Sequence, residues 1–193
     1  EGDLAVATFG RGYYILDDLT ALRRATADAL AREATLFPVR RPLVFMPESP
    51  LGIRGKAFQG EGYFTAPNPS FGAVLTWYLK DEIKTRKKTR QEREKDLVKQ
   101  GKDPDYPTRE DFRAEAREED PAVVLTIADA DGNVVRRLKG PATAGMHRIA
   151  WDLRFPPSTP TSLKPPVSDP FNEPPSGPMV APGRYTATLS KVV

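Results

Sequence analysis

The sequence contains no cysteine and a single histidine, His147. Without cysteine the chain can form no disulfide, hold no metal through thiolates and use no cysteine nucleophile. One histidine is too few for a histidine-rich metal site, and we expect His147 to be a structural or surface residue. The sequence shows no complete set of catalytic side chains. We therefore expect no catalytic residue, cofactor or metal in this chain.

Long apolar runs and a strong excess of one charge are also absent. No segment approaches the ~20 apolar residues that a membrane-spanning helix needs, so none is expected. The net charge of +3 is small. Residues 80–120 contain thirteen Lys or Arg and thirteen Asp or Glu, so the local charges cancel. Nucleic-acid binding is not expected, because a basic footprint needs uncompensated positive charge.

Proline and glycine are abundant, with 20 and 14 residues respectively, which favours β structure with long loops. The central segment, residues 121–154, has the pattern of three consecutive strands. Asp129 to Asn133 (DADGN) separate the first two and predict a tight hairpin turn with a bulge. A calcium loop starting at Asp129 would need an acid at its twelfth position, which is Gly140. The turn is the better interpretation.

Two further segments, residues 71–79 and 183–189, also alternate between apolar and polar positions. With the central strands they predict an antiparallel β-sandwich. We expect Trp77, Trp151 and Tyr185 to be structural anchors of its core, because aromatic side chains supply large apolar areas. Residues 155–182 are rich in proline and cannot form a central strand.

Three pieces of the sequence carry a resemblance: DADGNVVR (129–136), AGMHRIAWDLR (144–154) and PGRYTATL (182–189). They resemble the immunoglobulin-like module of flagellar hook-capping proteins, which also occurs at the C-termini of many secreted bacterial proteins. The resemblance covers roughly residues 121–190 and implies an immunoglobulin-like module there. Together with the strand pattern it leads us to expect a mainly β fold, with an antiparallel immunoglobulin-like sandwich over residues 36–193. It implies almost nothing about activity.

The charged segment at about residues 80–119 predicts a helical hairpin inserted between two strands. Lys88/Glu92 and Arg90/Glu94 have the i,i+4 spacing of helix-stabilising pairs. Thr108 and Asp111 have the spacing of a capping box. We expect a solvated arm that contacts a protein partner or a second copy of the chain.

The N-terminal residues 1–17 contain two short apolar runs around Gly10 to Gly12, which predict a β-hairpin. A lone hairpin is marginally stable, so we expect it to belong to a larger sheet. Residues 18–35 predict a short helical connector, with Asp17 or Asp18 and Thr26 as caps. Adjacent carboxylates point apart, so Asp17 and Asp18 are poor partners for glycoside hydrolysis.

Residues 7–18 (ATFGRGYYILDD) resemble the segment that closes the last blade of bacterial sortilin-like propeller proteins with BNR repeats. Residues 35–38, 68–73 and 78–80 resemble the C-terminal region of the same family, whose members carry a glycosyl hydrolase name. The Asp-box repeat of that family is absent from this chain. The resemblance implies a propeller upstream of residues 1–17 as a partner, and a secreted or periplasmic location.

The leading hypothesis is a non-catalytic C-terminal accessory module that braces the propeller or mediates assembly. One alternative is a carbohydrate-binding module, for which Tyr63 and Phe64 are the candidate ligand-surface aromatics, together with Tyr13 and Tyr14. Another is a contribution to a glycosyl hydrolase whose active site lies in the propeller. An ion pair between Asp152 and Arg154 is also possible from their spacing, and we expect it to be structural.

Overall fold

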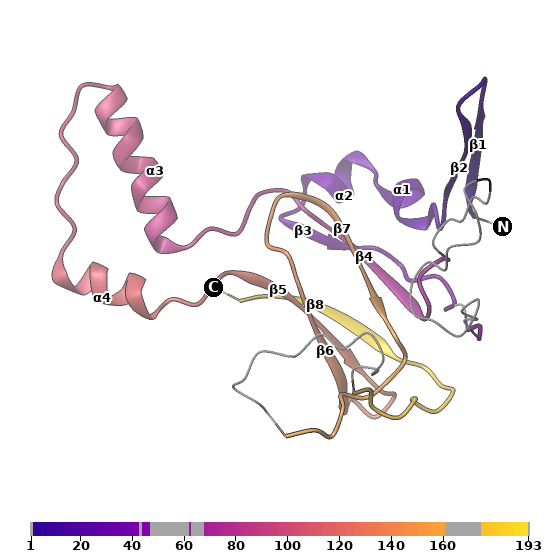
Figure 1. Ribbon diagram of the computed structural model, residues 1–193. Helices are drawn as coiled ribbons and strands as arrows, with labels where there is room; N and C mark the ends of the chain where they lie inside the picture. The colour runs from indigo at the N-terminus through magenta and orange to yellow at the C-terminus, as the bar shows by residue number, and fades with distance from the viewer. Residues whose placement is uncertain (1, 43, 47–61, 63–67, 161–174, 193) are drawn as a thin grey trace.

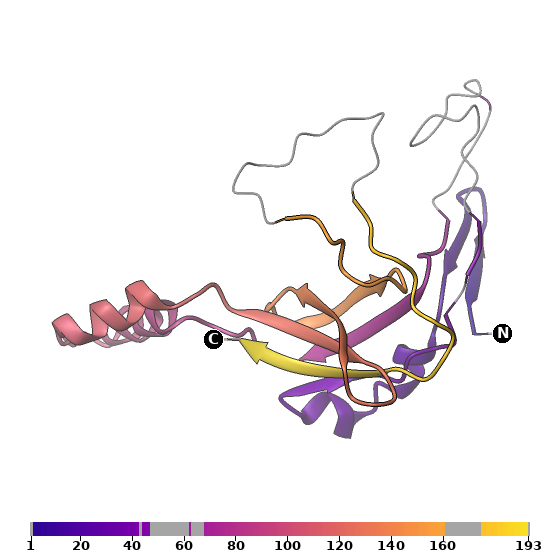
Figure 2. The ribbon, with the colours of Figure 1, turned by 90° about the horizontal axis from the view of Figure 1, so that it is seen from below.

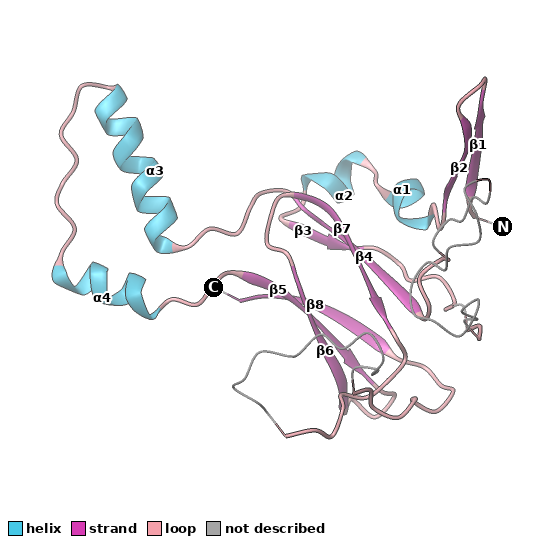
Figure 3. Ribbon diagram, viewed as in Figure 1, coloured by secondary structure: helices cyan, strands magenta, loops and turns pink. Residues whose placement is uncertain are grey.

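The computed structural model describes residues 2–42, 44–46, 62, 68–160 and 175–192. Tyr63 and Phe64 lie outside the described residues. The fold is mainly β, with antiparallel sheets and short helices (Figures 1 and 3). The expectation of a mainly β, antiparallel chain is thus confirmed.

Two three-stranded sheets form the centre of the molecule. The first has the order β3-β4-β7, with β3 at Ala34–Leu36, β4 at Ala73–Leu79 and β7 at Gly145–Trp151. The second has the order β6-β5-β8, with the ranges Val134–Gly140, Ala122–Ala128 and Thr186–Val192. The three strands expected in residues 121–154 are present. The third of them, β7, leaves its neighbours and pairs with β4 along its whole length.

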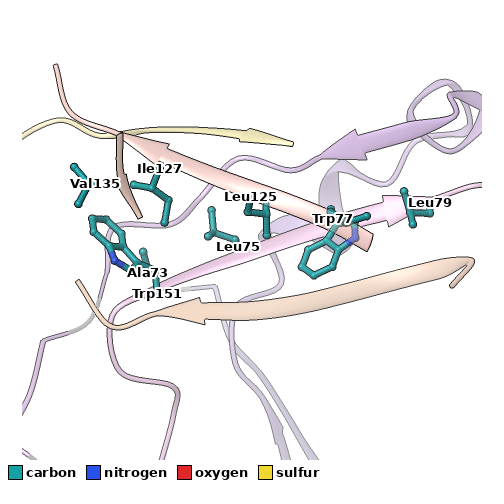
Figure 4. Packing of buried hydrophobic residues seen from close by; sticks show 9 residues of the cluster. Ala73, Leu75, Trp77, Leu79, Leu125, Ile127, Val135 and Trp151 are labelled. Carbon is teal, nitrogen blue, oxygen red and sulfur yellow. The ribbon is translucent and has the colours of Figure 1, made fainter. Parts of the chain in front are cut away.

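A single cluster of apolar side chains fills the space between the sheets (Figure 4). Strand β4 contributes Leu75 and Trp77, and β5 contributes Leu125 and Ile127. Trp151 of β7 closes one end of the cluster. Because both sheets direct alternate side chains into one shared core, the arrangement is compatible with a β-sandwich. We call these two sheets the two-sheet core.

The turn between β5 and β6 has the predicted form. The Asp129 carboxylate accepts hydrogen bonds from the backbone N–H groups of Asp131 and Asn133, at 3.0 and 2.8 Å. Gly132 has a φ of 86°, and a bulge interrupts the register at Ile127/Ala128. Hydrogen bonds from the side chain and backbone of Asn133 lower the pKa of Asp129. The carboxylate therefore holds the turn.

The insertion between β4 and β5 forms two helices, α3 at Arg86–Lys99 and α4 at Arg109–Arg117. Thr85 caps α3, and Thr108 and Asp111 form the predicted capping box of α4. The helical arm, defined as residues 86–117, extends away from the sheets (Figures 1 and 2). Because β4 and β5 belong to different sheets, the arm leaves from a connection between the two layers.

The N-terminal residues form the expected hairpin, with β1 at Leu4–Thr8 and β2 at Gly12–Leu16. Helices α1 (Thr20–Arg24) and α2 (Ala27–Ala31) follow and lie beside the first sheet (Figure 1). Thr26 caps α2 as predicted, with its hydroxyl accepting from the Ala29 N–H.

The remaining details of the connector differ slightly from expectation. The cap position of α1 is Leu19, although Asp18 still accepts a hydrogen bond from the Thr20 N–H at 3.0 Å. Strand β3 begins at Ala34, inside the expected connector, and is a short edge strand beside β4. The hairpin and the helical arm lie at opposite ends of the molecule (Figures 1 and 2).

Candidate functional site

The β1–β2 hairpin exposes apolar side chains on both of its faces. Every residue of the two strands is exposed. Tyr13 and Ile15 are 85% and 69% exposed, and Phe9 at the tip is fully exposed. The strand register divides the apolar side chains into two sets, one on each face of the hairpin. The first face carries Leu4, Val6, Tyr14 and Leu16, and the second carries Ala5, Ala7, Tyr13 and Ile15.

This pattern differs from that of a surface hairpin, which places polar residues on its outer face. Strands that are apolar on both faces are typical of sheets covered on both sides. A two-stranded hairpin is also marginally stable by itself in water. The hairpin surface, defined as the side chains of Leu4–Thr8, Phe9 and Gly12–Leu16, is therefore the best candidate interaction site among the described residues.

The base of the hairpin is tied to the rest of the chain through Asp3. One of its carboxylate oxygens accepts from the Asp18 backbone N–H at 2.9 Å and from Nη1 of Arg40 at 2.7 Å. The Leu19 N–H also donates to the Gly2 carbonyl at 2.7 Å. The hydrogen bond from Asp18 and the one from Arg40 lower the pKa of Asp3. The carboxylate thus joins the two ends of the hairpin.

Arg148 makes a second tie, from β7 to the segment where the hairpin ends. Its guanidinium donates from Nη1 to the Asp17 carbonyl oxygen at 2.9 Å and from Nη2 to the Asp18 carbonyl oxygen. Asp18 adopts a φ of 58°, which is rare for a residue other than glycine. Two successive carbonyl groups therefore bind one guanidinium.

A cleft of about 200 Å³ lies at this junction. Its polar lining includes Asp3, Asp17, Asp18, Arg40 and Arg148, and its apolar lining includes Val74 and Ile149. The Asp3 carboxylate accepts hydrogen bonds from Arg40 and from the Asp18 backbone N–H, and the Asp18 carboxylate accepts one from the Thr20 backbone N–H, so both are engaged in structural contacts. Among the described residues, no group of His, Asp and Glu side chains is arranged to hold a metal ion.

A network centred on Arg90 joins the two helices of the arm. The guanidinium binds both carboxylate oxygens of Glu115, at 2.6 and 2.9 Å, and also Glu94 at 2.6 Å. It lies 5.4 Å from the ring centroid of Phe112. Hydrogen bonding to Arg90 lowers the pKa of Glu115. No residue of either helix is buried. A second contact joins the helix ends, where the Arg86 backbone N–H donates to the Glu118 carboxylate at 2.8 and 2.9 Å.

The predicted i,i+4 pairs of α3 have a mixed outcome. Arg90 and Glu94 form the expected pair. Lys88 and Glu92 do not, because Lys88 binds Glu82 and Glu92 binds Lys84. Residues 82–84 precede the helix, so Lys88 and Glu92 of α3 both hold the incoming chain against the helix.

The aromatic residues expected as anchors lie in or against the core. Trp77 and Trp151 are 0% and 3% exposed. Tyr185 packs edge-on against Trp151, with ring centroids 5.4 Å apart, and its hydroxyl donates to the Ala181 carbonyl oxygen at 2.5 Å. The indole N–H of Trp151 donates to the Arg154 carbonyl oxygen at 3.0 Å. The two buried indoles offer no ligand surface.

His147 and the pair Asp152 and Arg154 have structural partners. The Nε2 atom of His147 lies 2.7 Å from the Thr143 carbonyl oxygen, and its ring lies 5.4 Å from that of Trp77. The Arg154 guanidinium donates to the Gly177 carbonyl oxygen at 2.9 Å, while Asp152 accepts from the Arg154 backbone N–H. Asp152 and Arg154 thus do not form the ion pair that the sequence allowed, since both side chains bind the main chain instead.

No model of a known protein family, no curated protein and no solved structure matches this chain. None of the helices in the described ranges is long and apolar enough to cross a membrane. The residues that the sequence did not single out are Asp3, Arg40 and Arg148. Their contacts join positions up to 131 residues apart, and no local pattern signals such a contact.

Proposed function

We propose that this chain is a non-catalytic accessory module of a larger, secreted β-propeller protein. In this proposal the β1–β2 hairpin belongs to a propeller blade, and the remainder of the chain braces the propeller from outside. The observation that carries the proposal is the hairpin surface, which is apolar and exposed on both faces.

A propeller blade would supply the neighbouring strands and the covering surfaces that this hairpin lacks. Blades are typically four-stranded antiparallel sheets arranged around a central channel, so each blade faces a neighbour on both sides. A hairpin with Leu4 and Tyr14 on one face and Tyr13 and Ile15 on the other fits such a position. Its open edges also offer backbone N–H and C=O groups that two further strands would pair.

The proposal assigns an immunoglobulin-like fold to the two-sheet core. The shared core between two antiparallel sheets is consistent with this class. The hydroxyl of Tyr185, the residue just before β8, donates to the Ala181 carbonyl oxygen four residues upstream. A tyrosine that bonds to upstream backbone in this way is a feature of many immunoglobulin-like domains. These features support the assignment without bearing on activity.

The helical arm is the second contact surface in this proposal. It lies at the end of the molecule opposite the hairpin, so both surfaces are accessible at once (Figure 2). Tyr106 is 88% exposed and Val98 is 61% exposed on this arm. A protein partner or another copy of the chain would bind here, which is the proposed route to assembly.

A carbohydrate-binding role receives less support. Stacking on a sugar ring requires aromatic side chains that present one common surface. Tyr13 and Tyr14 are exposed but adjacent on one strand, so they point to opposite faces of the hairpin. Trp77 and Trp151 are buried. Tyr63 and Phe64 lie outside the described residues, and a glycan array probed with the chain tests this alternative directly.

Hydrogen exchange of the hairpin amides tests the proposed function. The 193-residue chain is compared with the natural protein that includes the residues encoded upstream. The β1 and β2 amides should be only weakly protected in the chain alone, where the hairpin is formed but opens locally, and strongly protected in the longer protein. The amides of β5, which are paired on both sides, serve as the control and should be protected in both. Equal, fast exchange of the hairpin in both proteins would contradict the proposal.

A further inference from the structure

The direction of the hairpin is set at a short junction, residues 17–19, between β2 and α1. The chain turns sharply there, with Asp18 at a φ of 58°. Such a connection would be a hinge if only its own backbone restrained it, because a few terminal residues can absorb a large change in dihedral angles. The contacts at this junction decide whether it behaves as a hinge or as a rigid elbow.

Arg148 restrains the junction from the two-sheet core. Its side chain leaves the middle of β7, opposite Thr76 of β4, so its origin is fixed by a paired strand. Both terminal nitrogens bind carbonyl oxygens of consecutive residues, Asp17 and Asp18. The guanidinium is planar and its donors are in a fixed arrangement, so two such bonds restrain orientation as well as distance.

The Asp3 carboxylate restrains the same junction from the other side. It binds the Asp18 N–H, and Arg40 binds it in turn. Asp18 therefore has its N–H group held by Asp3 and its carbonyl group held by Arg148. Both bonds must break before this peptide segment rotates.

We propose that Arg148 is a positioning residue that makes the junction a rigid elbow and fixes the angle between the hairpin and the two-sheet core. This inference rests on the proposed function for its purpose. A blade hairpin held at one angle would seat the core in one orientation on the propeller. The geometric claim itself concerns the isolated chain and can be tested without a propeller.

The absence of cysteine makes a direct distance measurement possible. Spin labels are attached at Phe9→Cys, at the hairpin tip, and at Thr188→Cys, on an exposed position of β8 in the two-sheet core. Double electron–electron resonance then reports the distribution of distances between them. We expect one narrow maximum for the chain with Arg148 present.

Three variants in the labelled background test the role of Arg148. Arg148→Ala should broaden the distribution and remove the single narrow maximum. Arg148→Lys should give a distribution of intermediate width, because an ammonium group lacks the two donors that the planar guanidinium holds in a fixed arrangement. Asp3→Ala, combined with Arg148→Ala, should broaden it further. Arg137→Ala, which removes an exposed arginine from β6, is the matched control and should leave the distribution unchanged.

The midpoint of thermal unfolding separates positioning from a general loss of structure. Arg148 is exposed, so Arg148→Ala should leave the near-ultraviolet circular dichroism of the core tryptophans and the unfolding midpoint close to wild type. An unchanged narrow distribution in Arg148→Ala would overturn the inference. So would a broadening that occurs only together with a large fall in the midpoint. Failure of the exchange experiment with the longer protein would instead overturn the proposed function and leave the rigid elbow standing.

Discussion

Replacing Gly140 with alanine should disturb the core at one defined point. Gly140 is the last residue of β6, and an added Cβ would lie 2.6 Å from two carbon atoms of the Trp77 indole. Carbon atoms in favourable contact are about 3.5–4.0 Å apart. The Gly140 backbone lies outside the left-handed region, so alanine is allowed there and the cost is steric.

Trp77 has little room to move away from the new methyl group. Its side chain is 0% exposed and lies within the central cluster. Overpacking of a well-packed core costs about 1–3 kcal/mol. Replacing glycine by alanine also restricts the unfolded chain, which stabilises the folded state by about 0.4–1 kcal/mol. The midpoints of these two ranges, about 2 and about 0.7 kcal/mol, give an expected net loss in the free energy of unfolding of about 1.3 kcal/mol.

Urea unfolding measures this loss, with tryptophan fluorescence as the signal. Thermal unfolding should show a fall in the midpoint of about 2–4 °C for each kcal/mol in a chain of this size. Gly183→Ala is the matched control. Its added Cβ would meet no atom closer than 3.8 Å and its backbone is also outside the left-handed region, so its stability should be unchanged or slightly higher.

A double-mutant cycle identifies the contact responsible. Trp77→Phe removes the outer carbon atoms that the methyl group would meet, and it also removes an indole N–H that has no hydrogen-bond partner among the described residues. Gly140→Ala should therefore cost much less in the Trp77→Phe background than in wild type. Trp151 remains as the fluorescent reporter. Equal costs in both backgrounds, or a Gly140→Ala variant as stable as wild type, would refute the reasoning.

Three other substitutions test further contacts in the same structure. Gly72→Ala should destabilise the chain more than Gly140→Ala. The Cβ added at Gly72 would lie 2.0 Å from the Trp151 carbonyl oxygen, and the φ of Gly72 is 92°, which strains any residue with a side chain. The midpoint of thermal unfolding, followed by circular dichroism, measures the loss of stability. Arg90→Ala should speed hydrogen exchange in α3 and α4 and leave β5 unaffected. Arg90 lowers the pKa of Glu115 from its ordinary value of 4.5, so the contribution of this pair is fully present above about pH 4.5 and is lost as the pH falls through the lower, folded pKa. The arm amides of wild type should lose protection over that range, whereas those of Glu115→Gln should vary less with pH. A pH-independent arm would contradict this assignment.

Local patterns predicted much of the fold. The alternation of Leu75, Trp77 and Leu79 identified the buried face of β4, because successive side chains of a strand point to opposite faces. The sequence also predicted the Asp129 turn and the capping box at Thr108. In both, a side chain forms a hydrogen bond with the backbone of a residue only a few positions away.

These local patterns could not predict which strands pair with each other. A period of two indicates which side chains of β7 face inward, but the same pattern suits either sheet. Strand β7 pairs with β4 although β5 and β6 precede it directly in the sequence. The bond from Arg148 to Asp17 had no signal either, because an exposed arginine on a strand ordinarily faces water.

The hairpin is where the sequence pattern and the burial disagree. In β5 the apolar residues Val123, Leu125 and Ile127 are buried, so the chain itself covers the apolar face that the sequence predicts. In β1 and β2 an equally apolar pattern is exposed on both faces. Natural sequences tend to be locally consistent with their folds, and departures concentrate at functional sites. The exposure of Tyr13 and Ile15 thus supports the proposed partner surface independently of any family resemblance. The proposed rigid elbow at Asp18 would then set the orientation of that partner relative to the two-sheet core.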